Sequence, residues 1–374
     1  MSGSARRPRI LHVHSTFDRG GAELLCVRLI NAFADADHAV VSGDPARRGA
    51  AALIDPKRKV VWPAFPPLSG KPLPGRLKRL AAAMAGYDLI CTYNGSALDA
   101  ALAHTLFADV YKLEPLIHLE IGADEGVSAG LKRGRNFYRR IAIGRSAALV
   151  VPSRTLERIA LDVWQQPRSR VRLIPEGFDP RAFARTPKRD ALPGLVKRAD
   201  ELWVGTVAGA GEAEGLPPLV RAFSCLPEPW QLVILGEAPE RKTALAEAET
   251  EGVEHRVHFP GFVTDPAKVL GLFDLFTLSG SERFPVAQAM AAGLPVVTPR
   301  DGDVGATLAS ENGPFLAAPD DRDGLAEALA RLAADPALRK RVGEANRVKA
   351  RAEYDEATMI DRYHALFWGV MGRR

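Results

Sequence analysis

The residues best suited to chemistry gather in the stretch SERFPVAQAMAAGLPVVTP, residues 281–299, where an acid, Glu282, and an arginine precede Phe-Pro and a glutamine. Proline is favoured in the first turn of a helix, so the sequence predicts a helix over residues 285–292. The short apolar run that follows it, 295–298, is typical of a buried strand in a parallel sheet. An acid and free N–H groups at a helix start, on the carboxyl edge of such a sheet, suit a polyhydroxylated, negatively charged ligand.

Polar side chains also stand where strands of the first half are predicted to end. His118 and Glu120 close the predicted strand 115–120, Asp124 follows it, and Asn94 comes directly after an earlier strand. Because the carboxyl ends of parallel strands meet at one edge of a sheet, we expect these side chains to line a cleft. A carboxylate there could orient or deprotonate a substrate hydroxyl. The other interpretation of His118 is a hydrogen-bonded histidine of the core.

Glycines follow the first strand of each half of the chain. Gly20 and Gly21 let the backbone approach a ligand at the start of the next helix, whose N–H groups and positive end favour a phosphate. The other interpretation is a plain tight turn with Glu23 in the first turn of that helix. Gly209 and Gly211 follow the first strand of the second half, where backbone N–H groups could cradle an anion as well.

Strand-like and helix-like segments alternate along the chain, which predicts an α/β protein with parallel sheets. The strands expected on this basis are 10–14, 39–42, 59–62, 87–93, 115–120, 147–152, 171–175, 202–208, 231–235, 257–259, 275–278 and 295–298. A chain of 374 residues exceeds the usual limit of one core, so we expect two Rossmann-like domains. We place them at residues 1–180 and 181–355, with a last helix in 356–374 that crosses back to the first domain.

Composition is that of an ordinary globular protein, with 47% apolar and 25% charged residues. The sequence contains no apolar run long enough to span a bilayer, and MSGSARRPRI at the N-terminus lacks the apolar stretch of a signal peptide. The three cysteines lie far apart without metal-ligand spacing and are best explained as reduced thiols. We therefore expect a cytoplasmic protein without a metal site.

Charge is distributed unevenly between the two halves. Residues 1–180 hold 26 Lys and Arg against 17 Asp and Glu, whereas the remainder holds 24 against 28. Two basic clusters stand out: Lys132, Arg133, Arg135, Arg139, Arg140 and Arg145, and Lys71, Arg76, Lys78 and Arg79. Such clusters can dock on anionic lipid headgroups, and their other interpretation is a solvated helix face. Nucleic acid is not expected as a partner, because no base-stacking or helix-turn-helix pattern accompanies the charge.

The stretch 281–299 resembles the sugar-donor motif of the GT-B glycosyltransferases of family 4, in which Glu-Gly-Phe-Pro is followed by a second Glu and Ala-Met-Ala-x-Gly. Gly-Gly-Ala-Glu at 20–23, IPEGFD from 174, LVILGEAPER from 232 and FPGFV from 259 follow the family's order and spacing. The resemblance implies two facing Rossmann-like domains, with the nucleotide-sugar donor held mainly by the second and the acceptor by the first. It also implies a metal-independent, retaining transfer.

The resemblance, together with the patterns above, assigns candidate roles. Glu282 would fix the donor sugar, and Gln288 stands where the family has its second acid. The other interpretation of Gln288 is a solvated helix residue. The catalytic candidates are His118 and Glu282. The donor-binding candidates are Gly20, Gly21, Gly209, Gly211, Gly236, Phe262, Val263, Arg283, Phe284, Pro285 and Gln288. The acceptor-side candidates are Asn94, Glu120 and Asp124. No cofactor is expected, since the nucleotide-sugar is a substrate.

The sequence departs from the family in the loop 208–216, where Gly211 and Glu214 stand in place of the basic pair that neutralises the donor's diphosphate. Each lost charged hydrogen bond is worth roughly 1.5–3 kcal/mol. Backbone N–H groups of the glycines, Arg283 or Arg300 could compensate. We expect a transferase that moves a hexose-type sugar to a lipid-linked or polysaccharide acceptor in cell-envelope synthesis. The alternatives are a non-catalytic binding or regulatory relative and, less favoured, a sugar-nucleotide epimerase.

Overall fold

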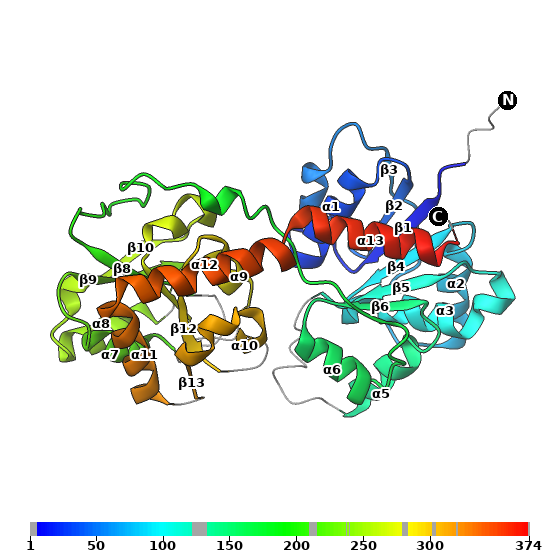
Figure 1. Ribbon diagram of the computed structural model, residues 1–374. Coiled ribbons are helices and arrows are strands. Elements are labelled where there is room, and N and C mark those ends of the chain that lie inside the picture. Colours follow the sequence, from blue (N-terminus) through cyan, green and yellow to red (C-terminus); the bar gives the residue numbers. More distant parts are fainter. Residues whose placement is uncertain are drawn as a thin grey trace. The chain divides into compact units, whose positions relative to one another are not determined.

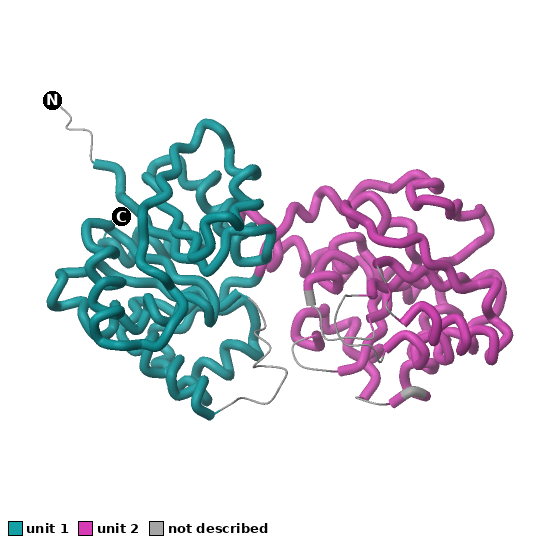
Figure 2. The backbone as a smooth tube through the Cα atoms, turned by 180° about the vertical axis from the view of Figure 1, so that it is seen from behind, with its two compact units in different colours: residues 1–175, 359–374 teal, residues 176–358 magenta. Residues whose placement is uncertain are grey.

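The computed structural model describes residues 6–121, 133–208, 215–236, 238, 240–278, 283–300, 304–318 and 321–372. The chain forms two compact units (Figures 1 and 2). Unit 1 comprises residues 1–175 and 359–374, and unit 2 comprises residues 176–358. Each unit has its own sheet and its own hydrophobic core.

Unit 1 is built on a parallel sheet whose seven strands, within the described residues, run in the order β3-β2-β1-β4-β5-β6-β7. The elements are β1 Arg9–His14, α1 Gly21–Ala32, β2 Asp37–Ser42, β3 Val60–Val61, α2 Pro74–Ala83, β4 Leu89–Tyr93, α3 Leu98–Tyr111, β5 Leu116–Leu119, α5 Arg133–Ala142, β6 Ala148–Val151, α6 Arg154–Asp162, β7 Val171–Leu173 and α13 Glu356–Val370. The strand order reverses between β1 and β4, which is where ligands of such sheets usually bind.

Helices cover both faces of this sheet, so its inner strands are buried and mostly apolar, with His12, His14, Thr92 and His118 as buried polar exceptions. α1 and α13 lie on one face (Figure 1). There Phe33, just after α1, packs against His364, Phe367 and Trp368. α2, α3, α5 and α6 contribute to the core on the other face.

Unit 2 has a parallel sheet of six strands, within the described residues, in the order β10-β9-β8-β11-β12-β13. Its elements are β8 Leu202–Ala208, α7 Leu216–Ser224, β9 Trp230–Gly236, α8 Arg241–Thr250, β10 Val257–Gly261, β11 Leu275–Thr277, α9 Arg283–Ala291, β12 Val296–Pro299, α10 Val304–Thr307, β13 Leu316–Ala317, α11 Arg322–Ala334 and α12 Pro336–Glu353. Here the order reverses between β8 and β11. α7, α8 and α11 pack on one face of the sheet, and α9 packs on the other.

The predicted α/β fold class with parallel sheets is confirmed. Every strand expected from the sequence is present with its ends within two residues of the expected ones. Strand β13, which has only two residues, was not expected. Helix α9 begins two residues before Pro285, so that the proline stands third, where its missing N–H still costs no helical hydrogen bond.

Candidate functional site

A cavity of about 330 Å³ lies at the carboxyl edge of the sheet of unit 2. Its walls come from the ends of β8 and β9, from the segment after β10, and from α9. The lining residues are Val207, Ala208, Leu235, Gly236, Phe262, Val263, Pro266, Leu270, Pro285 and Gln288. The lining is apolar apart from the Gln288 amide and backbone groups, so the cavity suits a flat, weakly polar group that can exchange a few hydrogen bonds.

Gly236 shapes this cavity. Its φ is +107°, a conformation that side-chain-bearing residues rarely adopt, and a Cβ atom there would lie 2.2 Å from the carbonyl oxygen of Ala208. The two residues are register partners at the ends of β9 and β8. Only glycine therefore allows the two strand ends to approach this closely beneath the cavity.

The structure brings together five of the donor-binding candidates, namely Gly236, Phe262, Val263, Pro285 and Gln288. Phe262 is 69% exposed although it is large and apolar, so its ring face is open to a ligand. Phe284 is half-buried and packs edge to face against Phe178, with 5.8 Å between ring centroids. Their roles toward a donor stay predictions.

Several candidates fall outside what the structure describes. Glu282, Gly209, Gly211 and Asp124 lie outside the described residues, and the side chain of Arg283 is likewise not described. Their roles stay predictions. The sequence patterns had not singled out Val207, Ala208, Leu235, Pro266 or Leu270, which also line the cavity. The first three could have been found from their places at the ends of predicted strands.

The start of α7 is closed to a phosphate. The Leu216 N–H donates to the Glu240 carboxylate, with 3.0 Å between N and Oε2. The next two residues of the helix are Pro217 and Pro218, which have no N–H. The first three residues of α7 therefore leave no N–H group for a ligand, and the Glu240 carboxylate already balances the positive end of the helix.

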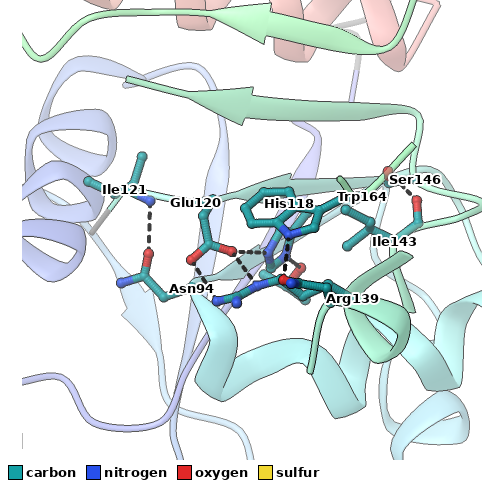
Figure 3. A network of polar contacts seen from close by, with 10 residues as sticks. Asn94, His118, Glu120, Ile121, Arg139, Ile143, Ser146 and Trp164 are labelled. Carbon is teal, nitrogen blue, oxygen red and sulfur yellow. Dashed lines mark hydrogen bonds and ion pairs between the residues drawn. The ribbon is translucent and has the colours of Figure 1, made fainter. Parts of the chain in front are cut away.

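In unit 1, His118 and Glu120 form a buried polar network with partners from β4 and α5 (Figure 3). His118 Nδ1 lies 2.8 Å from Thr92 Oγ1, and its Nε2 lies 3.4 Å from Glu120 Oε2. A ring that carries its proton on Nε2 donates to the carboxylate and accepts from the threonine hydroxyl. Both ring nitrogens are thus engaged.

Glu120 is held by an ion pair with Arg139 from α5. Arg139 Nε and Nη2 donate to the two carboxylate oxygens, each over 3.3 Å, and both side chains are only 2% exposed. The Arg139 guanidinium lies 5.1 Å from the ring centroid of Trp164, whose indole N–H donates to Asn136 Oδ1 (Figure 3). Arg139 had been grouped with a basic cluster, but this side chain is buried and paired.

Asn94 joins the ends of β4 and β5. Its N–H donates to the Leu119 carbonyl and its side-chain oxygen accepts from the Ile121 N–H, both over 2.8 Å (Figure 3). The structure therefore brings together three of the unit 1 candidates, Asn94, His118 and Glu120. Because His118 and Glu120 are buried, a substrate could reach them only after a local rearrangement. Their catalytic and acceptor-side roles stay predictions.

Gly20 and Gly21 stand at the start of α1, close to Glu23. A Cβ atom on Gly20 would lie 2.5 Å from Glu23 Oε2. The other carboxylate oxygen of Glu23 lies 3.4 Å from His14 Nδ1, and burial lowers the pKa of His14, although Glu23 opposes this effect. A phosphate at this helix start would meet the charge of Glu23, so the predicted phosphate contact requires the Glu23 side chain to move.

Two further observations bear on ligands. Among the described residues, no group of three or more His, Cys, Asp or Glu side chains is placed to hold a metal ion. In the same part of the chain, none of the helices combines the length and apolar character needed to cross a membrane.

Two α/β units with parallel sheets, the second with a cavity at its carboxyl edge, define the GT-B class of fold. HepE from Anabaena, solved in complex with UDP and glucose, superposes with a TM-score of 0.73 over 97% of this chain and 100% of HepE. At 18% sequence identity, this likeness shows the fold alone.

Two family models match the chain. Residues 19–182 match the model described as Glycosyltransferase Family 4, and residues 200–335 match the model described as Glycosyl transferases group 1. The chain therefore belongs to the family 4 glycosyltransferases, as its motifs predicted.

Curated relatives match parts of the chain. The lipopolysaccharide core biosynthesis glycosyltransferase LpsD of Rhizobium meliloti (strain 1021) is 29% identical over 168 residues, which are 43% of this chain and 48% of LpsD. The D-inositol 3-phosphate glycosyltransferase of Xylanimonas cellulosilytica is 28% identical over 252 residues, which are 62% of this chain and 60% of that protein. The chain spans about half the length of these relatives.

Proposed function

We propose that the protein transfers a hexose-type sugar, with retention of configuration, from a nucleotide-diphosphate donor to a lipid-linked or polysaccharide acceptor in cell-envelope synthesis. The observation that carries this proposal is the cavity of unit 2. Five residues expected near the donor, Gly236, Phe262, Val263, Pro285 and Gln288, come from three separate parts of the sequence and line that one cavity. The names of the relatives, one of which acts in lipopolysaccharide core synthesis, support the acceptor class.

The cavity provides for the base and ribose of the donor. The exposed ring of Phe262 offers a stacking surface for a base, and the Gln288 amide can both donate to and accept from a ribose diol. The bond from the sugar's anomeric carbon to the diphosphate breaks, the acceptor oxygen bonds to that carbon on the same face, and the acceptor's proton leaves with the diphosphate. No metal is required.

The diphosphate of the donor is negatively charged and needs positive charge or N–H donors in its binding site. No lysine or arginine lines the cavity among the described residues, and the start of α7 has no free N–H group. The N–H groups of Arg283 and Phe284 at the start of α9, next to the cavity, are candidates to bind it. We therefore infer weaker donor binding than in relatives with the usual basic pair.

The first experiment is a calorimetric titration with UDP, GDP and their hexose conjugates. We expect one base to be preferred, and Gln288→Leu to raise the Kd about tenfold through the loss of about 1.4 kcal/mol of hydrogen bonding. Phe262→Ala removes the stacking surface and should weaken binding similarly. Phe137→Ala, which removes another phenylalanine that is 63% exposed, is the matched control and should bind like the wild type. Absence of binding by every nucleotide and conjugate contradicts the proposal.

A second candidate is a non-catalytic sugar-nucleotide-binding protein, and the uncharged lining of the cavity favours it. Release of UDP or GDP from the bound conjugate, followed by chromatography, separates the two. Release that is lost in Glu282→Ala supports the transferase, whereas binding without release supports the non-catalytic relative. Interconversion of the sugar without release indicates an epimerase.

We place the protein at the cytoplasmic surface of a membrane, with the basic unit 1 toward anionic headgroups. The excess of 26 basic over 17 acidic residues in residues 1–180 supports this location, as does an acceptor attached to a lipid.

A further inference from the structure

Large apolar side chains are exposed on two neighbouring helices of unit 1. Leu106 and Val110 on α3 are 51% and 70% exposed, and Phe137 and Ile141 on α5 are 63% and 41% exposed. Each pair is spaced i, i+4, which puts its two members on one side of a helix. Single exposed apolar residues are ordinary, whereas a group of large ones on adjacent elements marks a contact surface.

The two pairs lie on the same outer surface. α3 and α5 both contribute to the core on one face of the sheet, so their outward sides point the same way. The helices are joined where Thr105 Oγ1 donates to the Ala142 carbonyl over 2.7 Å. Leu106 and Ile141 are the sequence neighbours of these two residues and are both exposed, so each apolar pair has one member within one residue of the place where the helices meet.

The surface is basic as well as apolar. Arg133 and Arg140 lie four residues before and three residues after Phe137, so they stand on the same side of α5. Both are exposed, and no ion pair within the described residues involves either of them. Residues 133–142 contain no acid, and the nearby Asp109 of α3 is bound through both oxygens by Arg145.

Two other members of the basic clusters, Arg139 and Arg76, are already paired and cannot take part. Arg139 is buried against Glu120, and Arg76, 11% exposed, donates to Asp99 over 2.7 Å. Arg133 and Arg140 therefore provide the exposed charge that stands beside Phe137 on α5.

We propose that this surface, made of Leu106, Val110, Phe137, Ile141, Arg133 and Arg140, docks on a membrane that contains anionic lipids. Apolar side chains would enter the headgroup region while the guanidinium groups pair with lipid phosphates. A second copy of the same surface fits less well, because a two-fold contact would bring the unpaired arginines together. The proposal rests on the lipid-linked acceptor of the proposed function and adds the site of contact.

The test is co-sedimentation of the full chain with phosphatidylcholine vesicles that either contain or lack phosphatidylglycerol. We expect binding only to the anionic vesicles, and less at about 1 M than at about 0.1 M salt, because the Debye length falls from about 10 to about 3 Å. Phe137→Ser with Arg140→Gln should lower the partition coefficient about tenfold or more.

A matched control is available on α12 of unit 2. Val348, 60% exposed, and the exposed Arg351 are spaced i, i+3, so Val348→Ser with Arg351→Gln makes the same change of charge and a similar change of apolar surface. This control should bind anionic vesicles like the wild type. All variants should melt like the wild type, since the changed side chains are exposed.

The proposal is overturned if both double variants bind anionic vesicles as strongly as the wild type. It is also overturned if both double variants lose vesicle binding to the same extent, because that result indicates attraction by net charge alone. The proposal is also overturned if the wild type does not bind vesicles but forms a dimer, and the double variant Phe137→Ser with Arg140→Gln is monomeric. That result indicates a contact between protein chains. Nucleotide binding by the same samples, measured without vesicles, reports on the donor site of unit 2 independently.

Discussion

At the scale of single residues, the most unusual feature is a chain of buried histidines in unit 1. His12 Nε2 lies 3.1 Å from His38 Nδ1, and its Nδ1 lies 2.9 Å from the Tyr93 hydroxyl. The chain ends where His38 Nε2 donates to the Phe33 carbonyl over 3.2 Å. His14 stacks on the same tyrosine, with 4.0 Å between ring centroids.

These histidines should make the fold sensitive to acid. Burial lowers the pKa of His12, His14 and His38 below the ordinary value of 6.5. The unfolded chain therefore binds more protons below about pH 6.5, so the stability that these groups provide is complete above that pH and is lost as the pH falls. Each histidine adds up to roughly 1.4 kcal/mol per pH unit to the slope. Urea unfolding at several pH values between about 7.5 and 5.5 measures it.

His14→Phe should flatten that slope, because it keeps an aromatic ring against Tyr93 and removes one titrating group. The control is His255→Gln, which changes a histidine whose side chain is 61% exposed and should leave the slope unaltered. A wild-type free energy of unfolding that is constant over this pH range would show that these histidines do not couple to folding.

At the scale of elements, the Glu120–Arg139 ion pair connects α5 to the end of β5. Arg139→Ala leaves a carboxylate that is 2% exposed without its cation, so we expect a loss of about 3–5 kcal/mol in the free energy of unfolding. Arg139→Met with Glu120→Gln removes both charges and keeps a hydrogen-bonding partner for His118. This double variant should recover at least half of the loss, as measured by urea denaturation.

The matched control is an ion pair of the same chemistry at the surface. Arg145 binds Asp109 through two hydrogen bonds of 2.7 and 2.9 Å, and the two side chains are 50% and 79% exposed. Arg145→Ala should leave the unfolding midpoint within error, because solvent screens exposed pairs. An equal loss for Arg139→Ala and Arg145→Ala would contradict the structural role of the buried pair.

Elements were the part of this structure that the sequence predicted best. Apolar runs between glycine and proline signals indicated the strands. The resemblance to the family 4 glycosyltransferases indicated Gly236 and Gln288 as donor-binding candidates, and the two residues line one cavity. Side-chain partners were not predictable. Arg139 appeared as one cation in a basic run, because its partner Glu120 is 19 residues away and only the packing of α5 brings them together.

At the scale of the whole molecule, the chain enters unit 2 after residue 175 and leaves it after residue 358. The two ends of unit 2 are bonded to each other, since the Phe178 N–H donates to the Tyr354 carbonyl and the Glu356 N–H donates to the Phe178 carbonyl, both over 2.9 Å. Unit 2 is thus closed on itself, whereas unit 1 is made from two separate parts of the sequence.

This difference predicts how truncation acts. Ending the chain at Asp355 removes Met359, Tyr363 and Phe367, which are buried in the core of unit 1. Loss of a buried aromatic side chain costs about 3–5 kcal/mol and loss of a buried methionine about 2–5 kcal/mol, so losing these three is comparable to the whole stability of a typical domain. We expect unit 1 to become sensitive to protease while unit 2 stays resistant. A chain that lacks only residues 373 and 374 is the control, and resistance of both units in the Asp355 truncation contradicts the prediction.

The position of α13 also sets an order of events during synthesis. Residues 1–175 leave the ribosome first, yet the helix that completes their core comes only after all of unit 2. At about 5–20 residues per second, the face of the sheet that α13 covers waits roughly 10–40 seconds for its partner. Residues 1–175 therefore depend on chaperones or on loose local packing until α13 has been synthesised, while unit 2 can fold as soon as it emerges.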